Sequence, residues 1–219
     1  MKPLTSNSTD VKGLEQLGRA SVQIIHDLKN QLNGLKLYAT FLKKRLEKAG
    51  GPTDEQETVS KLISGLDRAA ADMTALVRLG KPLELRKQKS VDLSQLLRRA
   101  TAEVGGIQVE IAVEPLTCDV DATALGEAIK TICNGALSRA SGSEAEIKVR
   151  LWIDRESDPV VARIEWQGIN RDDPVNPFDS YIGSEGLRMS LAARIIAAHD
   201  GEVSRKDDRL AAWLPVATS

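Results

Sequence analysis

A heptad repeat of apolar residues in the N-terminal part of the chain constrains the fold more than any other feature. From Leu28 onward the apolar positions alternate in steps of four and three, and similar spacing extends back to Leu14. This spacing is typical of a helix that packs against a partner along its whole length. We therefore expect a helix from about Asp10 to Lys48, about 60 Å long at 1.5 Å per residue.

A second helix follows after a short break. Ala49-Gly50-Gly51-Pro52 ends the first helix, and Thr53 with Gln56 forms a capping box for the next one. The second helix ends near Gly80, and its apolar residues again step by three and four. They are Val59, Leu62, Leu66, Ala69, Met73 and Leu76. Two long helices joined by a short loop form an antiparallel hairpin.

The hairpin is expected to dimerise. One hairpin buries both apolar stripes poorly, whereas two copies bury them in a four-helix bundle, so we predict a homodimer. The alternative is a hairpin that packs against the rest of its own chain. In this interpretation residues 1–10 are a flexible N-terminus, and residues 11–80 form the hairpin domain.

The composition excludes several classes of protein. With 42% hydrophobic and 28% charged residues, the chain is expected to fold as a soluble protein. Its net charge of −1 predicts neither a nucleic-acid partner nor a membrane partner. No apolar run approaches the ~20 residues of a transmembrane helix, and Met1 to Asp10 lacks a signal-peptide core. Cys118 and Cys133 form no metal-binding pattern, so we expect a cytoplasmic protein without a metal site.

Residues 83–219 show a mixed pattern of strands and helices. Strands are expected within 83–91, 107–113, 146–154 and 160–167, with a final hairpin over 202–216. Helices are expected over 93–104, 121–140 and 186–198, and Asp92 and Asp121 cap the first two. Residues 168–184 are polar and irregular. Strands grouped with three helices imply a two-layer α+β domain.

A histidine stands on the first helix beside groups that can handle its protons. His26 is followed by Asp27, and Asn30 lies one helical turn further along on the same face. Ile25 and Leu28 face the seam, which leaves His26 at the edge of the bundle. A neutral imidazole nitrogen can attack phosphorus, and Asp27 can orient or deprotonate the ring. The alternative is a solvated histidine without a role.

Two other residues receive structural interpretations. His199 lies at a helix C-terminus, where an imidazolium interacts favourably with the helix dipole, and we interpret it as a structural cap of that helix. Cys133 lies on an apolar helix face and is interpreted as a core residue.

The ordered motifs resemble the core of a two-component sensor histidine kinase, from about Leu14 to Pro215. The segment from His26 to Asn30 resembles the H box, Asn134-Gly135-Ala136 the N box, and the segment from Gly186 to Gly201 the second glycine box. The resemblance implies a dimerisation and phosphotransfer hairpin, followed at residues 83–219 by a Bergerat-type (GHKL) ATP-binding sandwich. It also implies that Asn30 positions water for dephosphorylation of a partner. That partner is a response-regulator receiver domain, which supplies Mg²⁺ and the phosphorylated aspartate.

The chain departs from this family at the nucleotide site. The family places an aspartate after a strand to bind the adenine amino group, whereas this chain has Trp166, and an indole cannot accept a hydrogen bond. Losing that acceptor costs about 1–3 kcal/mol. Arg188 replaces a glycine that lets the backbone approach phosphate. Asn134, Gly168 and Gly186 are then vestiges of a cofactor-binding site that we expect to be inactive.

These departures favour a histidine phosphotransferase, similar in plan to the ChpT type, that relays phosphoryl groups between His26 and receiver aspartates. Such a protein needs no cofactor of its own, because the receiver brings the Mg²⁺. Two alternatives remain open. One is an ATP-dependent histidine kinase with a divergent pocket for ATP-Mg²⁺. The other is a receiver-binding scaffold or phosphatase.

Overall fold

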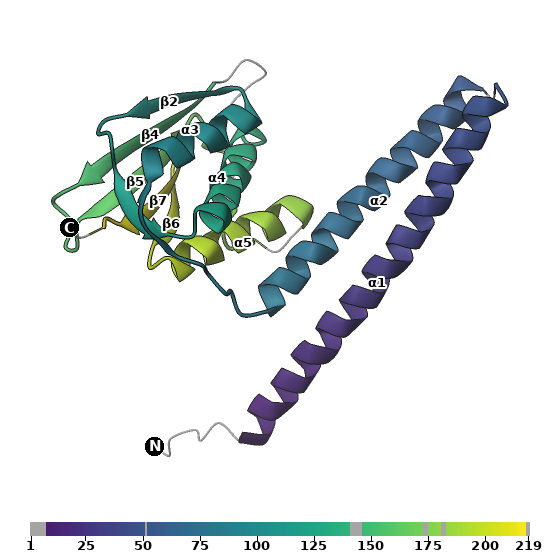
Figure 1. The fold of residues 1–219 in the computed structure, drawn as a ribbon, viewed down its shortest axis with the longest axis horizontal. Helices are drawn as coiled ribbons and strands as arrows, with labels where there is room; N and C mark the ends of the chain where they lie inside the picture. The colour runs from purple at the N-terminus through teal and green to yellow at the C-terminus, as the bar shows by residue number, and fades with distance from the viewer. Residues whose placement is uncertain (1–7, 51, 141–145, 173–174, 181–182, 218–219) are drawn as a thin grey trace. The chain divides into compact units, whose positions relative to one another are not determined.

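A computed structural model describes residues 8–50, 52–140, 146–172, 175–180 and 183–217, with side chains from Ser21 onward. The chain divides into two compact units, Met1–Pro82 and Leu83–Ser219. The first contains a helical hairpin, and the second combines a mixed sheet with three helices (Figure 1). This is the α+β fold class that the sequence predicts.

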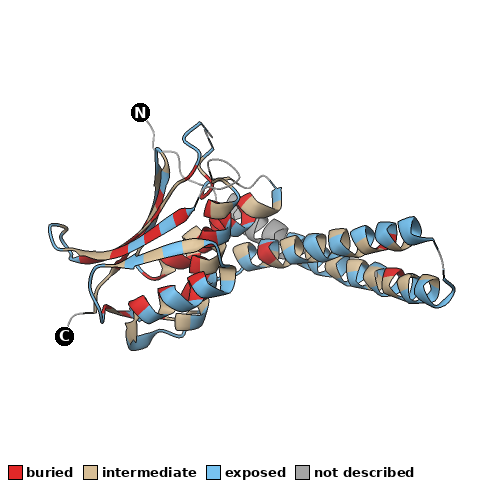
Figure 2. Ribbon diagram, turned by 90° about the horizontal axis from the view of Figure 1, so that it is seen from above, coloured by how far each residue is buried: buried red, intermediate tan, exposed pale blue. Residues whose placement is uncertain are grey.

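Two long helices, α1 (Ser8–Lys48) and α2 (Thr53–Gly80), form the first unit. α1 begins two residues before the expected start at Asp10, and the flexible N-terminus expected at 1–10 lies mostly outside the described residues. An ion pair of 2.5 Å between Lys36 Nζ and Asp67 Oδ1 joins the two helices. Figure 2 shows that most described residues of the hairpin are exposed or half-buried. The hairpin therefore retains apolar surface that its own two helices do not cover.

The capping box predicted at the start of α2 is wrong. Thr53 is already the first helical residue, Pro52 occupies the N-cap, and no side chain caps the helix. The backbone N–H of Gln56 donates to the Pro52 carbonyl at 3.3 Å. Proline suits a helix start because its φ is fixed and its missing N–H would have no partner there.

The second unit contains two sheets. The larger has the strand order β2 (Ile107–Ile111), β4 (Ile147–Asp154), β5 (Val161–Gln167), β7 (Arg209–Pro215) and β6 (Glu202–Lys206). β2 and β4 are parallel, and the other neighbours are antiparallel. The smaller sheet pairs β1 (Gln88–Asp92) with β3 (Thr117–Val120). β3 was not predicted, because four residues give little room for an alternating pattern.

Three helices cover one face of the larger sheet: α3 (Leu93–Val104), α4 (Ala122–Leu137) and α5 (Gly183–Ala198) (Figure 1). The two predicted caps are confirmed. Asp92 accepts hydrogen bonds from the backbone of Ser94 and Gln95, and Asp121 from that of Thr123 and Ala124. α5 begins three residues earlier than expected. Figure 2 shows buried residues concentrated where these helices meet the sheet.

In the described part of the chain, none of the helices combines the length and the apolar character needed to cross a membrane.

Candidate functional site

The surface of α1 carries the three residues that the sequence singled out around the histidine. The side chains of His26 and Asp27 are 62% and 60% exposed. Asn30 Nδ2 lies 3.3 Å from His26 Nδ1, and Asp27 Oδ1 lies 3.8 Å from the same ring nitrogen. The helix thus brings a carboxylate and an amide to one side of an accessible imidazole. That is the geometry needed to control its protons.

A fourth side chain, Gln23, belongs to this cluster although the sequence analysis did not single it out. Gln23 Nε2 donates a hydrogen bond of 3.1 Å to Asp27 Oδ1, the oxygen next to the imidazole. The signal was present in the sequence, because Gln23 and Asp27 stand four residues apart on a helix. We name Gln23, His26, Asp27 and Asn30 the histidine cluster.

Large apolar side chains remain exposed on two flanks of α1. The heptad seam residues Ile24, Leu28, Leu35 and Leu42 are between 42% and 60% exposed. At about 100° per residue these positions project on the flank opposite His26. Leu37 and Phe41, 69% and 68% exposed, project on the same flank as His26. Clusters of exposed apolar residues mark interaction surfaces, so α1 has two separate candidates.

Trp166 lies in the core of the second unit, on β5. Its side chain is 0% exposed, and its indole Nε1 donates to Cys133 Sγ on α4 at 3.2 Å. Burial raises the pKa of the Cys133 thiol to about 11, which keeps it neutral. Cys133 is the core residue that the sequence predicted. The neighbouring carboxylate, Glu165, alternates to the other face of the sheet, where Arg209 donates to it at 3.1 Å.

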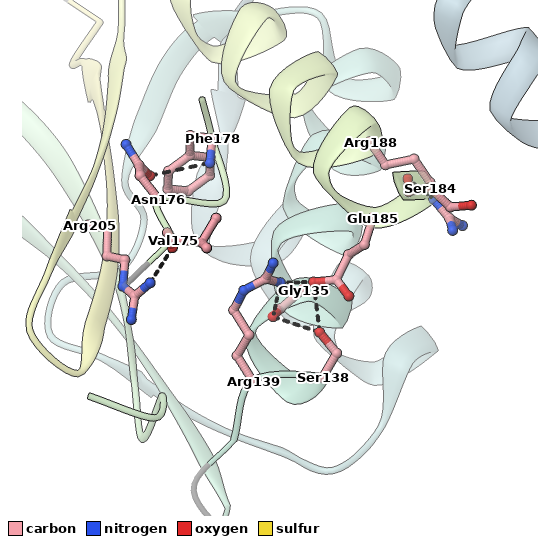
Figure 3. Close-up of polar contacts among 10 residues, drawn as sticks. All are labelled: Gly135, Ser138, Arg139, Val175, Asn176, Phe178, Ser184, Glu185, Arg188 and Arg205. Carbon is pink, nitrogen blue, oxygen red and sulfur yellow. Dashed lines mark hydrogen bonds and ion pairs between the residues drawn. The ribbon is translucent and has the colours of Figure 1, made fainter. Parts of the chain in front are cut away.

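An open pocket of about 420 Å³ lies between α4 and α5. It is lined by Thr131, Asn134, Gly135, Ser138, Glu185 and Arg188. Figure 3 shows Glu185 in an ion pair with Arg139, and Ser138 Oγ donates to the same carboxylate at 2.8 Å. Asn134 and Arg188 each donate to a carbonyl of their own helix, both at 3.0 Å. These polar side chains are therefore engaged with neighbours in the same chain.

The two glycines expected at a nucleotide site both lie against backbone. Gly168 has φ +99°, and a Cβ there would lie 2.9 Å from the Glu146 carbonyl oxygen. A Cβ at Gly186 would lie 2.5 Å from the Ser180 carbonyl oxygen. Packing within the chain is sufficient to require glycine at both positions.

The described parts of the segment between β5 and α5 are held against the rest of the unit. The backbone N–H of Asn170 donates to the Arg139 carbonyl at 2.7 Å. Arg205 on β6 donates to the carbonyls of Asn170 and Val175, and its bond to Val175 is drawn in Figure 3. Ser190 Oγ lies 3.0 Å from the Phe178 carbonyl oxygen.

Comparisons with known proteins support the fold. Neither a family profile nor a curated protein matches the sequence, but solved structures do. Full-length ShkA in complex with AMPPNP superposes with a TM-score of 0.64 and 20% identity over 90% of this chain. The Acinetobacter baumannii histidine kinase AdeS gives a TM-score of 0.54 and 12% identity over 84% of this chain and 96% of its own. The fold is that of a histidine kinase core. This chain spans 45% of the ShkA chain.

Within this histidine kinase fold the predicted site residues fall into two separate groups. His26, Asp27 and Asn30 lie together on the hairpin. Asn134, Gly168 and Gly186 lie in the second unit. Only Asn134 of these three lines the pocket between α4 and α5. Trp166 on β5 and Cys133 on α4 lie in this unit, and neither side chain provides a carboxylate that could accept a hydrogen bond from an adenine amino group.

His199 lies at the C-terminus of α5, where the sequence predicts a structural cap, but it is uncharged. It is 2% exposed, with Nδ1 2.8 Å from the Ile195 carbonyl oxygen and Nε2 accepting from the Asp121 backbone N–H at 2.9 Å. One nitrogen must donate and the other accept, so the ring is neutral with its proton on Nδ1. Burial lowers the pKa of His199 below its ordinary 6.5. The structural role predicted for His199 is confirmed, but as a neutral group rather than an imidazolium: it bonds to the last turn of α5 and ties α5 to the start of α4.

This arrangement predicts an acid-sensitive second unit. The folded-state pKa of His199 is lower than the unfolded value, so below about pH 6.5 the unfolded chain binds the proton first. The stabilising contribution is complete above that pH and is lost as the pH falls toward the folded pKa. We expect the free energy of unfolding to fall by up to about 1.4 kcal/mol per pH unit in this window. Urea titrations of wild type and His199→Gln test this, and equal pH slopes in the two proteins would contradict it.

Proposed function

We propose that this protein is a histidine phosphotransferase that relays phosphoryl groups between His26 and receiver-domain aspartates in a two-component phosphorelay, without binding ATP. One contrast carries the proposal. His26 is 62% exposed beside Asp27 and Asn30, whereas the polar groups around the α4–α5 pocket bind one another. An accessible histidine, in a chain whose polar groups in the nucleotide region already bind one another, favours phosphate from another protein.

The chemistry needs little from this chain beyond the cluster. A ring nitrogen attacks the phosphorus of an aspartyl phosphate, the N–P bond forms, and the P–O bond to the receiver aspartate breaks. Asp27 orients the ring or takes its proton. The receiver supplies the Mg²⁺ that neutralises the phosphoryl oxygens, as well as the aspartate. The exposed apolar residues Leu37 and Phe41 support docking of a receiver on this flank.

The region of the second unit that resembles a nucleotide site supports a function without ATP binding. Trp166 is a donor bonded to Cys133 and offers no acceptor for an adenine amino group. Glu185 is held by Arg139 and Ser138. A nucleotide between α4 and α5 would meet polar groups that already bind one another, and it would find no acceptor for its amino group in Trp166 or Cys133.

The decisive experiment offers the protein two phosphate sources. We expect radiolabel to move from a phosphorylated receiver to the protein, and none to move from labelled ATP-Mg²⁺. Calorimetric titration with an ATP analogue is expected to show no saturable micromolar binding. Labelling from ATP would overturn the proposal and favour the ATP-dependent kinase.

A receiver phosphatase is the second candidate, because the amide of Asn30 lies beside the histidine. An amide at this place can position a water molecule against a receiver phosphate that docks over His26. A phosphatase depends on Asn30 and a relay depends on His26, so substitutions separate the two functions.

We also propose that the protein works as a homodimer, with the seam residues of two hairpins forming a four-helix bundle. Leu28, Leu35 and Leu42 are 42%, 54% and 46% exposed in the single chain. On α2, Leu62 and Leu76 are 52% and 42% exposed. A second copy would bury them, and burial of one leucine contributes about 1.5–3 kcal/mol.

Leu35→Asp is therefore expected to dissociate the dimer, because it places a carboxylate in each half of the seam. The molar mass from light scattering should halve. Leu37→Asp is the matched control, since Leu37 is 69% exposed but projects on the His26 flank. Equal masses for wild type and Leu35→Asp would contradict the bundle.

A further inference from the structure

We propose that Asn30 and Gln23 are positioning residues that hold neutral His26 in its unreactive tautomer until the receiver docks. The inference rests on the proposed function and concerns how its histidine is switched. It follows from the order of donors and acceptors in the histidine cluster.

Nε2 is the ring nitrogen that remains for chemistry. Nδ1 already faces two side chains of its own helix, Asn30 Nδ2 at 3.3 Å and Asp27 Oδ1 at 3.8 Å. An incoming phosphorus atom needs an unobstructed line to the attacking lone pair. The side of the ring that carries Nδ1 is partly blocked by these neighbours, so attack is expected from Nε2.

Asn30 sets the position of the ring proton. An amide nitrogen is a donor only, so Nδ1 must accept from Asn30 Nδ2 with its lone pair. A neutral imidazole carries one proton, which then lies on Nε2. A protonated Nε2 has no lone pair with which to form the N–P bond. The observed orientation of Asn30 is therefore a resting state.

Gln23 favours the same tautomer, because its side chain donates to Asp27, the carboxylate that could otherwise bind the proton on Nδ1. The carboxylate of Asp27 would accept a proton from Nδ1, which would leave the lone pair on Nε2. In the structure, Asp27 Oδ1 accepts from Gln23 Nε2 at 3.1 Å and lies 3.8 Å from Nδ1, beyond hydrogen-bond distance. The amides of Gln23 and Asn30 lie about one helical turn before and after His26, and both favour the tautomer with the proton on Nε2.

Phosphoryl transfer requires the opposite arrangement. When Asn30 turns its amide oxygen toward the ring, or Asp27 leaves Gln23, Nδ1 holds the proton and Nε2 has its lone pair. Nε2 then bonds to phosphorus, and the receiver carboxylate leaves with the electron pair of the broken P–O bond. The ring retains its Nδ1 proton, which the Asn30 amide oxygen or Asp27 accepts as a hydrogen bond.

Nitrogen NMR of the full chain, with labelled histidine, tests the resting state directly. At about pH 8.5 an ordinary imidazole is neutral, and the shifts of its two nitrogens report the tautomer. We expect His26 in the wild type to carry its proton mainly on Nε2. Asn30→Ala and Gln23→Ala should each raise the Nδ1–H to Nε2–H ratio by about twofold to tenfold, the effect of one hydrogen bond. Asn30→Gln, which keeps an amide, should restore part of the wild-type ratio.

His199 is an internal reference for these spectra, because its two bonds fix the proton on Nδ1. Its signals should stay unchanged in every variant of the cluster. A wild-type His26 that carries its proton mainly on Nδ1 would overturn the proposal. So would tautomer ratios that do not respond to either alanine substitution.

Transfer rates then test whether the tautomer controls the reaction. Gln23→Ala should accept phosphate from the phosphorylated receiver about twofold to tenfold faster than wild type, in proportion to its tautomer ratio. A changed ratio with an unchanged rate would overturn the switch. The NMR measurement involves no receiver. If the substitutions shift the tautomer but the protein never accepts phosphate, the proposed function is refuted while the assignment of the ring proton still holds.

Discussion

His26→Ala is expected to abolish phosphoryl acceptance, with a loss of about a thousandfold or more in labelling from the phosphorylated receiver. The chain has two histidines, and the other, His199, is 2% exposed and bonded through both ring nitrogens. No second imidazole can therefore take over the role. The substitution itself should be structurally mild, because the His26 side chain is 62% exposed.

The measurement follows radiolabel from the receiver to the protein. Gln31→Ala is a matched control, since Gln31 is an exposed amide residue on the same helix that projects about 140° away from His26, and it should retain most of the labelling. Circular dichroism should show the same helix content in both variants. If His26→Ala still shortened the lifetime of the receiver phosphate as wild type does, the protein would be a phosphatase that depends on Asn30, and the relay would be refuted.

Local patterns in the sequence were sufficient to predict most of the helices and strands. Asp92 and Asp121 cap their helices through bonds that span two or three residues, so the sequence shows both partners at once. The heptad seam predicts α1 and α2 because it recurs every three or four residues. The error at Thr53 arose because a helix start can be displaced by one residue when proline supplies the N-cap geometry.

The side-chain contacts of the candidate site could be predicted only between residues that are close in the sequence. His26, Asp27 and Asn30 lie within one helical turn and were identified together. The ion pair between Arg139 and Glu185 joins two different helices, and the bond between Trp166 and Cys133 joins a strand to a helix. Such contacts depend on the packing of the whole unit. The sequence showed that Trp166 offers no hydrogen-bond acceptor, but it did not show that its indole donates to Cys133.

Trp166→Asp would place a carboxylate at the position where the resemblance to histidine kinases leads us to expect an adenine-binding aspartate. We expect it to destabilise the second unit, not to restore nucleotide binding. Trp166 is 0% exposed, and loss of a buried tryptophan side chain costs about 3–5 kcal/mol. The new carboxylate would face Cys133, a weak donor whose neutral thiol cannot replace water. Burying it adds several kcal/mol unless it takes up a proton, and the total exceeds the stability of many domains.

Two further variants keep this prediction testable if Trp166→Asp does not fold. Trp166→Phe keeps an aromatic ring in the core but removes the bond to Cys133 and leaves a small cavity, so we expect a loss of about 1–3 kcal/mol in urea unfolding. Trp152→Asp is the matched control on the other face of the sheet, where Trp152 is half-buried and has Arg150 5.4 Å from its ring centre. It should cost less than Trp166→Asp, because water and Arg150 can solvate the carboxylate. A folded Trp166→Asp protein that binds an ATP analogue with micromolar affinity would contradict the prediction, since one side chain would then be all that separates this pocket from a working nucleotide site.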